Sequence, residues 1–419
     1  MVVAMASTYK RTTCRLCGTY LLPVLSLRPT PPANAFLARP AVLPVHPLDL
    51  MLCRDCGNVQ LGTVVDPQLL FRDYTYVSGT APSFVRHLED YAADLIGRLD
   101  LRAGDAVVEI GSNDGTMLRA FRRRGLRVLG LDPATEIARA AAGSGLPTLP
   151  EFFTPALVPT ILELLGRPPR LVVANNVLAH IDDLDQTVRG IVDLLRQPFG
   201  QRAALALEVQ YLPDLLAAGA FDLVYHEHLN YHSVRPLARF LGRHGLTHLD
   251  VRRQPVHGGS IRVVASIGQS DSCGDCLNER PVTVDDFLAL GRSIETTATV
   301  LQSRIANIRA AGRRVVGYGA PAKSTTFLHQ MGLGAADIAY IVDDSPLKQG
   351  RYTPGTLIPI TSPDRLVAEP DATHLLALAW NFFGELRERH PRFPWIRPFP
   401  TVEVVRPVVR VEPSVTEPR

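Results

Sequence analysis

The sequence predicts an α/β protein with two parallel sheets and a small cysteine-bearing domain ahead of them. Residues 107–124 and 314–330 each combine an apolar run, a glycine-rich turn and a helical pattern, which is typical of a parallel sheet. Near the start of the chain, the segment C-x-x-C-G occurs twice. At 419 residues, the chain is long enough for two or three domains with separate cores.

The composition argues against two classes of partner. A net charge of +3 is too small for a nucleic-acid-binding surface, so we expect no nucleic-acid partner. The sequence contains no apolar run of the roughly 18 residues that a membrane span needs. The opening segment MVVAMASTYK lacks the charged-then-apolar order of a signal peptide. We therefore expect a cytoplasmic protein without a membrane partner. We also expect a monomer.

Four cysteines predict a structural zinc site. Cys14 and Cys17 stand in CRLCG, and Cys53 and Cys56 stand in CRDCG. Each such turn points two thiolates at one metal, and four soft thiolates suit tetrahedral zinc without leaving a position open for catalysis. The alternative is four reduced cysteines or two disulfides, and reducing cytosol disfavours disulfides. Because prolines are frequent between the two pairs, we expect a loop-rich zinc-binding cap over residues 1–65.

A third C-x-x-C pair, Cys273 and Cys276, has no partner pair in the sequence. Two cysteines alone do not complete a zinc site. We interpret this pair as structurally incidental, and the alternative is a metal or redox role.

The segment FRDYTYVSGTAPSF, residues 71–84, links the cap to the first sheet. Tyr74, Tyr76 and Ser78 alternate along it, so their side chains point the same way if the segment is extended. These residues either line a binding site or pack between the cap and the sheet. A helical pattern over residues 84–99 follows and leads to the first strand.

The first strand, residues 107–110, leads through a glycine-rich turn into a helix at residues 117–124. Gly111 and Gly115 can adopt backbone angles that other residues resist, and their missing side chains let a ligand approach the main chain. Asp132 ends the next apolar run. A carboxylate that binds ribose hydroxyls stands at such a strand end. Its spacing fits a dinucleotide fold, but G-x-G-x-x-G is absent. We predict a nucleotide-type cofactor at this turn.

A third apolar strand, residues 171–174, ends at Asn175 and Asn176. Ligands of open α/β sheets bind beyond the carboxyl ends of the strands, so Asn176 is a candidate cofactor ligand. His180 follows closely in the same segment, ANNVLAHIDD. It either caps or packs at a helix start, or it takes part in chemistry beside the cofactor.

The densest group of titratable side chains follows a strand predicted at residues 204–209. The segment VYHEHLNYHS contains Tyr225, His226, Glu227, His228, Tyr231 and His232. Histidine at this density indicates metal binding or proton transfer. Because the zinc pattern H-E-x-x-H is absent, we favour proton transfer, and a metal site is the alternative.

A predicted antiparallel hairpin ends the first α/β domain near Gly268. Its strands cover residues 246–251 and 260–266, and QPVHGG joins them. Three further candidates lie at this hairpin, where they either line the crevice or face water: His257, Ser260 and Arg262.

A second α/β unit begins with a long helical pattern over residues 283–311. A strand and the turn GYGAPAKSTT follow, and Lys323 adds a cation to helix N-terminal amides that favour phosphate. The next strand, residues 338–342, ends in Asp343, and Lys348 lies just beyond. The G-K-[ST] order of a Walker A loop is absent. We predict a site for a diphosphate-bearing substrate, and the alternative is a purely structural repeat.

These motifs, taken in order, resemble one known family. The sequence is similar to the S-adenosylmethionine (SAM)-dependent sugar C-methyltransferases of deoxysugar and antibiotic biosynthesis, which methylate ring carbons of nucleotide-linked 4-keto-6-deoxysugars. The motifs are CRLCG with CRDCG, YTYVSG, VEIGSNDG, ANNVLAHIDD, YHEHLNYHS, HGGSIR and GYGAPAKS with VDDSPLKQG.

The resemblance implies a class I SAM methyltransferase core of Rossmann-like fold over residues 66–270. The cap, residues 1–65, would hold structural zinc, and residues 271–419 would form a second α/β domain that binds the nucleotide sugar. The implied SAM ligands, with Asp132 on the adenosine ribose, are Glu109, Gly111, Asn113, Asp114, Gly115, Asp132 and Asn176.

The resemblance also implies that His228 is the catalytic base. The pocket around it would contain Tyr225, Glu227, Tyr76 and His180. The expected substrate ligands are Tyr74, Ser78, His257, Ser260, Arg262, Lys323, Asp343 and Lys348.

The chemistry of the residues agrees with this family. A sugar carbon becomes nucleophilic only when a hydrogen beside a carbonyl is removed, so the substrate must be a ketosugar. Neutral His228 takes that proton, and donors such as Tyr225 or His180 stabilise the enolate oxygen, with Tyr76 as a third candidate. Glu227 orients a histidine or a sugar hydroxyl.

A 4-ketone activates both neighbouring carbons, C3 and C5. We expect methylation of C3 on a dTDP-linked sugar, and C5 methylation is the first alternative. An O-methyltransferase could use the same pocket, because it needs only to deprotonate a hydroxyl. The near-neutral charge disfavours a zinc-ribbon nucleic-acid methyltransferase or binder.

Overall fold

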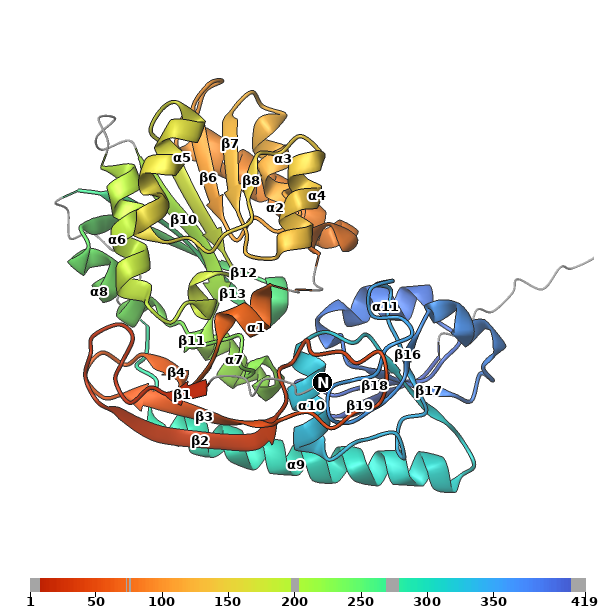
Figure 1. Ribbon diagram of the computed structural model, residues 1–419. Coiled ribbons are helices and arrows are strands. Elements are labelled where there is room, and N and C mark those ends of the chain that lie inside the picture. Colours follow the sequence, from red (N-terminus) through yellow and green to blue (C-terminus); the bar gives the residue numbers. More distant parts are fainter. Residues whose placement is uncertain (1–7, 73, 75–76, 197–202, 269–278, 408–419) are drawn as a thin grey trace, which may run out of the picture.

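The computed structural model describes residues 8–72, 74, 77–196, 203–268 and 279–407. Within these residues the chain forms four sheets, which belong to an N-terminal, a middle and a C-terminal part (Figure 1). Three residues considered above lie outside the described residues: Tyr76, Cys273 and Cys276.

The middle domain is built around a seven-stranded sheet. Its strands are β6 (Ala106–Ile110), β7 (Arg127–Leu131), β8 (Thr148–Leu149), β9 (Leu171–Asn175), β10 (Ala204–Gln210), β12 (Leu246–Gln254) and β13 (Ser260–Ile267). The order is β12-β13-β10-β9-β6-β7-β8, parallel except for the β12–β13 hairpin. The order reverses between β6 and β9, which creates the switch point where such sheets bind ligands. This is the order of a class I SAM methyltransferase core, so the predicted fold class is confirmed.

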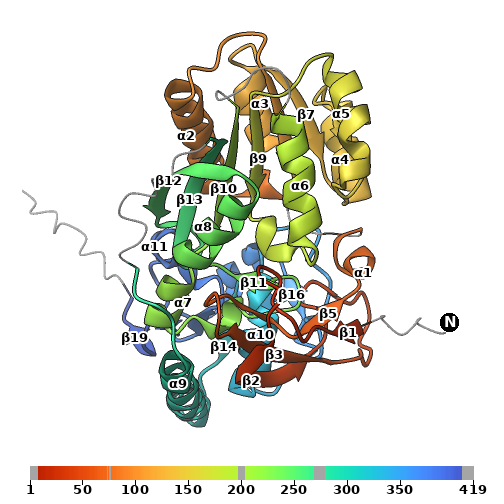
Figure 2. The same ribbon diagram turned by 90° about the vertical axis from the view of Figure 1, so that its left-hand side faces the viewer.

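Helices cover both faces of this sheet (Figures 1 and 2). The two core clusters on its faces contain α2 (Pro82–Arg98) and α3 (Thr116–Arg122) in one, and α5 (Val158–Leu165), α6 (Leu184–Leu195) and α8 (Val234–Arg243) in the other. Val107 belongs to the first cluster, and Val108 to the second. Because neighbouring side chains of a strand point to opposite faces, β6 is buried throughout and is apolar except for Glu109. Three further helices are α1 (Pro67–Phe71), α4 (Thr135–Gly143) and α7 (Leu212–Ala218).

The N-terminal part contains a long antiparallel hairpin, which the expectation of a loop-rich cap did not include. Its strands are β1 (Thr8–Lys10), β2 (Leu21–Thr30), β3 (His46–Cys53), β4 (Val59–Leu61) and β5 (Thr63–Val65). Pro23 and Pro29 lie within β2. Proline is tolerated there because β2 is an edge strand whose register shifts between Pro23 and Leu25 and between Leu27 and Thr30.

One strand of the N-terminal sheet comes from far along the chain. The strand β11 (Asn230–Tyr231) lies within the histidine-rich segment and pairs with β4. The N-terminal hairpin therefore shares a sheet with the middle domain. The boundaries at residues 65 and 270 stay a prediction.

The C-terminal part is the second α/β unit. Its strands are β14 (Val315–Tyr318), β15 (Ile341–Val342), β16 (Ile360–Thr361), β17 (His374–Ala377), β18 (Trp395–Arg397) and β19 (Glu403–Val405). The order is β16-β15-β14-β17-β18-β19, with β19 antiparallel. The glycine-rich turn after β14 lies at the switch point between β14 and β17, as in the middle domain. The helices are α9 (Val284–Ala310), α10 (Lys323–Met331) and α11 (Phe383–Arg389).

The long helix α9 joins the parts into one body. It runs beneath the β2–β3 hairpin and the C-terminal sheet (Figures 1 and 2). One hydrophobic core contains Leu48 of β3, Phe221 of the middle domain, Phe287 of α9 and Phe327 of α10. This shared core fixes the loops that meet between the sheets. Among the described helices, none combines the length and the apolar character that a bilayer crossing requires.

Candidate active site

A cavity of about 1260 Å³ lies where the three parts of the chain meet. It exceeds the roughly 300–1,000 Å³ of a typical ligand pocket and therefore has room for two molecules. Residues of the predicted cofactor site and residues of the predicted substrate site border this same cavity. The candidate residues that border it are Tyr74, Ser78, Glu109, Gly111, Asn113, Asp132, Asn176, His180, Tyr225, His228, His257, Lys323, Asp343 and Lys348.

The glycine-rich turn after β6 has the backbone geometry that the sequence predicts. Gly111 and Gly115 have φ angles of 69° and 74°. A Cβ atom on Gly111 would overlap the side chain of Val177, so this position requires glycine. Asp114 does not border the cavity; its Oδ2 accepts a hydrogen bond from Gly79 N at 3.0 Å. Asp114 thus secures the turn from behind.

Asp132 is held in place by backbone amides at the carboxyl end of β7. Its Oδ2 accepts from Asn113 N at 2.8 Å, and its Oδ1 accepts from Ala134 N at 2.9 Å. Burial raises the pKa of this carboxyl, and the two amides oppose that rise. The carboxylate is therefore fixed on the cavity wall, where it suits the ribose hydroxyls of a nucleoside.

Glu109 is buried on the same wall with one oxygen unpaired. Its Oε2 has no hydrogen-bond partner among the described residues. Burial raises the pKa of Glu109 well above its usual range, and the charges of Asp114 and Asp132 raise it further. An unpaired buried acceptor of this kind fits a ligand ammonium group. Two carboxyls on one wall, Asp132 and Glu109, are compatible with the hydroxyl and ammonium groups that SAM carries.

Tyr225 and His228 form the shortest contact among the titratable groups of the histidine-rich segment. The Tyr225 hydroxyl lies 2.7 Å from His228 Nε2, and His228 Nδ1 lies 2.9 Å from the Leu223 carbonyl oxygen. A carbonyl can only accept, so Nδ1 carries the proton and Nε2 accepts from Tyr225. Burial lowers the pKa of His228 well below its usual value, so the imidazole is neutral.

His180 faces His228 from the 3-10 helix η3 (Leu178–His180) that follows β9. The two imidazole centroids are 5.1 Å apart. Burial lowers the pKa of His180 to about 4. His180 is thus a second neutral imidazole on the cavity wall.

Glu227 does not border the cavity and is tied to the N-terminal part. Asn34 Nδ2 donates to Glu227 Oε1 at 2.9 Å and to Oε2 at 3.0 Å, and the Tyr74 hydroxyl lies 3.4 Å from Oε2. Burial raises the pKa of Glu227 to about 7, and these donors oppose the rise. Sequence analysis missed Asn34, which borders the cavity. No local pattern marks it, because its partner is 193 positions away.

The other two histidines of this segment are buried, and of these His226 borders the cavity whereas His232 does not. His226 Nε2 donates to the His46 carbonyl oxygen at 3.2 Å, and His232 is 1% exposed. Among the described residues, this segment contributes no group of three side chains that could hold a metal. The alternative of a metal site here is therefore not supported.

The turn after β14 brings one cation, Lys323, to the opposite wall. Lys323 Nζ donates to Asn381 Oδ1 at 2.9 Å and lies 3.7 Å from the centre of the Trp380 ring. Burial lowers the pKa of Lys323 to about 8, and the charge of Asp222 opposes that shift. Sequence analysis missed Trp380 and Asn381, although their position just beyond β17 was a signal.

Lys348 and Asp343 complete this wall. Lys348 Nζ donates to the Ala320 carbonyl oxygen at 2.9 Å and lies 3.6 Å from Asp343 Oδ2. The same carboxylate oxygen accepts from Ala320 N at 2.6 Å. The acid therefore fixes the glycine-rich turn and holds one of the two lysines.

The structure separates the three candidates at the hairpin. His257 borders the cavity, where its ring lies 4.9 Å from that of Phe84. Ser260 is buried outside the cavity lining. Arg262 neither lines the crevice nor faces water, because its Nη2 makes a buried ion pair with Glu208 Oε2 at 3.0 Å.

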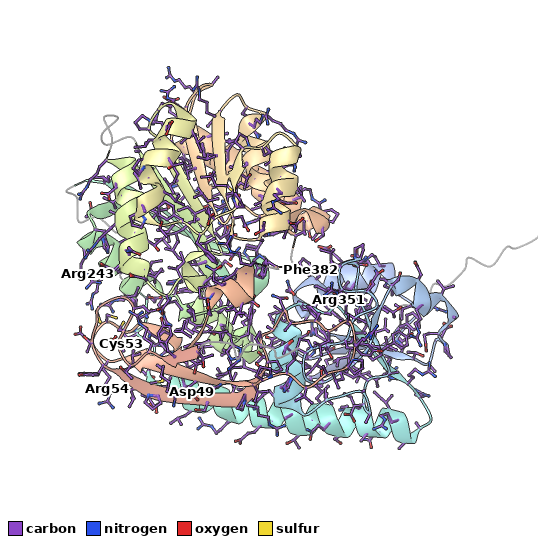
Figure 3. All side chains as sticks on the ribbon, viewed as in Figure 1. Asp49, Cys53, Arg54, Arg243, Arg351 and Phe382 are labelled. Atoms are coloured by element: carbon purple, nitrogen blue, oxygen red, sulfur yellow. The ribbon has the colours of Figure 1, made fainter. Side chains whose placement is uncertain are left out.

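The four cysteines meet at the end of the N-terminal sheet, where Figure 3 labels Cys53. Their sulfur atoms all lie within 4.8 Å of one another, with Cys14 and Cys56 3.6 Å apart and Cys17 and Cys53 3.4 Å apart. Tetrahedral zinc with bonds of about 2.3 Å needs sulfur atoms about 3.8 Å apart. The cluster therefore fits one structural zinc ion.

Three family models match successive parts of the chain. They are described as "Putative zinc binding domain" over residues 14–71, "Methyltransferase domain" over residues 84–251 and "C-methyltransferase C-terminal domain" over residues 255–396. The C-methyltransferase NovU of Streptomyces niveus is 35% identical over 400 residues, which cover 91% of this chain and 92% of NovU.

Two solved methyltransferase structures are also similar. Magnesium protoporphyrin IX methyltransferase from Synechocystis PCC 6803 with bound SAM is 16% identical and has a TM-score of 0.32, with 44% of this chain and 79% of that chain covered. The 1,6-didemethyltoxoflavin-N1-methyltransferase of Burkholderia thailandensis is 16% identical and has a TM-score of 0.32, with 43% and 78% covered.

The family follows from the relative that spans both chains. NovU matches almost the whole length at 35% identity, and the strand order, the glycine-rich turn and the four-cysteine cluster agree with the matched domains. The methyltransferase domain binds SAM, and the N-terminal domain binds a structural zinc ion. The chain therefore belongs to the family of SAM-dependent C-methyltransferases that carry an N-terminal zinc-binding domain.

Proposed function

We propose that this C-methyltransferase methylates C3 of a dTDP-linked 4-keto-6-deoxysugar. The observation that carries the proposal is the Tyr225–His228 hydrogen bond of 2.7 Å on the wall of a cavity that also borders Asp132 and Lys323. A neutral imidazole that accepts a proton is required only if the methylated atom must first lose one. Carbon beside a ketone meets that condition.

The Tyr225–His228 pair supplies the base. Nδ1 of His228 is committed to the Leu223 carbonyl, so Nε2 is the only open proton acceptor on the ring. Nε2 is engaged by the Tyr225 hydroxyl. The phenol oxygen therefore takes the proton from C3 while its own proton passes to Nε2. The C3–H electron pair forms the enolate, and His228 becomes an imidazolium.

The negative charge of the enolate develops on the 4-oxygen of the sugar. His180 is neutral and carries one N–H group, because burial holds its pKa at about 4. An N–H donor in a buried site stabilises such an oxyanion strongly. SAM, when bound, supplies an electrophilic methyl group on a sulfonium sulfur. The enolate carbon and that methyl must lie close together, which a cavity bordered by both sets of residues allows.

Glu227 orients the substrate side of this arrangement. Its two oxygens accept from Asn34, so the carboxyl is fixed although it is buried. Because Asn34 borders the cavity and Glu227 does not, Glu227 acts on the substrate through Asn34.

Lys323 and Lys348 suit the diphosphate of a nucleotide sugar. Both lysines border the cavity, and both are held by neighbouring acceptors rather than extended into water. Fixed ammonium groups bind phosphate oxygens with little loss of side-chain entropy. In this proposal residues 271–419 hold the nucleotide end and residues 66–270 hold SAM.

The test is incubation of the purified protein with SAM and a panel of nucleotide-linked 4-ketosugars and their 4-hydroxy counterparts. We expect one new C–CH₃ group at C3 by NMR, and only with ketosugars. A methyl group on C5 or on oxygen refutes the C3 assignment. Solvent-deuterium exchange at C3 with S-adenosylhomocysteine in place of SAM gives a second check, because an O-methyltransferase predicts no exchange.

A further inference from the structure

An arginine stands between the cysteines of the first pair and reaches into the middle domain. The Arg15 side chain is 0% exposed. Its Nε donates to Asp182 Oδ1 at 2.8 Å, and its Nη1 donates to the carbonyl oxygens of Leu61 at 2.8 Å and Leu229 at 3.3 Å. The residue directly before it, Cys14, belongs to the four-cysteine cluster.

Two of these acceptors adjoin the histidines of the cavity. Leu229 directly follows His228, and Asp182 lies two residues after His180. The two loops also bond to each other, from Leu229 N to the Ala179 carbonyl oxygen at 2.7 Å. One guanidinium group therefore contacts both loops whose imidazoles face each other.

The cysteine cluster fixes where this guanidinium lies. Cys14 and Cys17 bracket Arg15, so a metal that holds their sulfur atoms also holds the Arg15 main chain. Arg15 N donates to Gln60 Oε1 at 2.8 Å, which adds a second restraint from β4. A planar guanidinium presents several donors in one rigid fork, and this lets it hold three acceptors at once.

We propose that Arg15 is a positioning residue that couples the four-cysteine site to the His180 and His228 loops. This rests on the proposed function only in assigning catalytic roles to the two histidines. Metal binding by the cysteines would then do more than stabilise the N-terminal sheet. It would also fix the position of Arg15 and, through Arg15, the two loops beside the cavity.

The chain offers a matched control for the charge of Arg15. Arg11 Nη1 also makes an ion pair with Asp182, at 3.0 Å, and the Tyr9 hydroxyl contacts the same carboxylate. Arg11 is 25% exposed, and none of its side-chain hydrogen bonds reaches Leu61 or Leu229. Because Asp182 keeps these partners, Arg15→Met removes the contact to both loops without stranding a buried carboxylate.

Coupling between two sites is reciprocal. If Arg15 couples the zinc site to the loops beside the cavity, a ligand that orders those loops must slow the loss of zinc. S-adenosylhomocysteine is a suitable ligand because Asn176, Asp182 and His180 border the cavity that the cofactor fits. This readout needs no methyl acceptor.

The experiment compares the wild type with Arg15→Met, Arg15→Lys and Arg11→Met. Zinc content, kcat, KM for SAM and the rate of zinc transfer to a coloured chelator are measured, the last with and without S-adenosylhomocysteine. We expect Arg15→Met to keep its zinc, to lose about tenfold or more in kcat and to change KM for SAM by less than about threefold. Arg15→Lys should recover part of the loss, and Arg11→Met should resemble the wild type.

S-adenosylhomocysteine should slow zinc transfer by about fivefold or more in the wild type and in Arg11→Met, which is the size of ordinary coupling, and not in Arg15→Met. Equal protection of zinc in Arg15→Met refutes the proposal, as does a kcat equal to that of Arg11→Met. Should Arg15→Met fail to fold, Arg15→Lys decides by the same two measurements. If the methyl acceptor is not a 4-ketosugar, kcat cannot be measured with that substrate. The rate of zinc transfer still tests the coupling through Arg15.

Discussion

The hydroxyl group of Tyr225 lies 2.7 Å from Nε2 of His228, the nitrogen of that ring that carries no proton. The base that the sequence assigns to His228 is therefore covered by a phenol. Proton abstraction by this imidazole must pass through Tyr225 or wait until Tyr225 moves away. These two routes predict different behaviour of one variant.

Replacement of Tyr225 by phenylalanine distinguishes the two routes. If the proton passes through the phenol oxygen, Tyr225→Phe should reduce solvent-deuterium exchange at sugar C3 by about 10²- to 10⁴-fold, as His228→Ala should. The exchange is followed by NMR with S-adenosylhomocysteine bound. If Tyr225→Phe exchanges at the wild-type rate while His228→Ala does not, the imidazole acts directly and the relay is wrong.

Tyr231 is the matched control for this variant. It is buried in the same segment but does not border the cavity. Tyr231→Phe should therefore exchange within about threefold of the wild type, since buried acid–base groups outside the site do not touch the substrate. A large loss in this control would show that the tyrosine changes act through folding.

The pH dependence of exchange follows from the state of His228. The base must be neutral, and its activity is lost as the pH falls through its folded-state pKa. Burial lowers that pKa well below the usual 6.5, and His180 lowers it further. With Glu227 replaced by glutamine, we expect the exchange rate to change by less than about twofold between pH 8 and pH 6, whereas an ordinary histidine would lose most of its neutral form.

Glu227 also titrates in this range, because burial raises its pKa to about 7. An inflection near pH 7 that Glu227→Gln removes therefore reports on Glu227. A loss of rate centred near pH 6.5 that persists in Glu227→Gln contradicts the prediction for His228.

The sequence predicts what is local and misses what is distant. The strand, turn and helix around Gly111 follow from apolar runs and glycines within about 20 residues, which set the hydrophobic period and the turn. The contact of Asn34 with Glu227 and the pairing of β11 with β4 join segments more than 150 residues apart. No periodicity encodes such pairs, because they depend on how finished elements pack.

The density of histidine was likewise only a partial guide to the site. His228 borders the cavity, but His232 lies buried away from it. The segment turns through β11 between these residues, so side chains close in sequence point to different surroundings. Composition indicated the segment, and the backbone path decided which of its imidazoles border the cavity.

The glycine-rich turn offers a test of the cofactor site. Gly111→Ala adds a Cβ that overlaps Val177, at a φ of 69° that alanine resists. We expect affinity for S-adenosylhomocysteine, measured by calorimetry, to fall by about tenfold or more, since a strained residue costs of order 1–3 kcal/mol.

Gly97→Ala is the control for this change. Gly97 lies in α2, and no atom would lie within 4 Å of its added Cβ apart from its own helix. Alanine is favoured over glycine in a helix by about 1 kcal/mol, so this variant should bind normally and melt at the same or a higher temperature. Normal affinity in Gly111→Ala would show that the turn does not hold the cofactor.

The pH dependence of substrate binding should report on Lys323. Burial lowers the pKa of this lysine to about 8, so its positive charge is present below pH 8 and lost above it. We expect KM for the nucleotide sugar to rise by about tenfold between pH 7 and pH 9, because each charge-assisted hydrogen bond contributes about 1.5–3 kcal/mol. Lys323→Arg should bind the diphosphate at both pH values, because arginine keeps its charge.

Lys348 separates this effect from a general need for positive charge. It borders the same cavity and is held by Ala320 and Asp343. Lys348→Met should raise KM at every pH but leave the inflection near pH 8 in place, because Lys323 still titrates. Lys323→Met should remove the inflection. If the inflection survives in Lys323→Met, another group binds the diphosphate and the assignment of Lys323 is wrong.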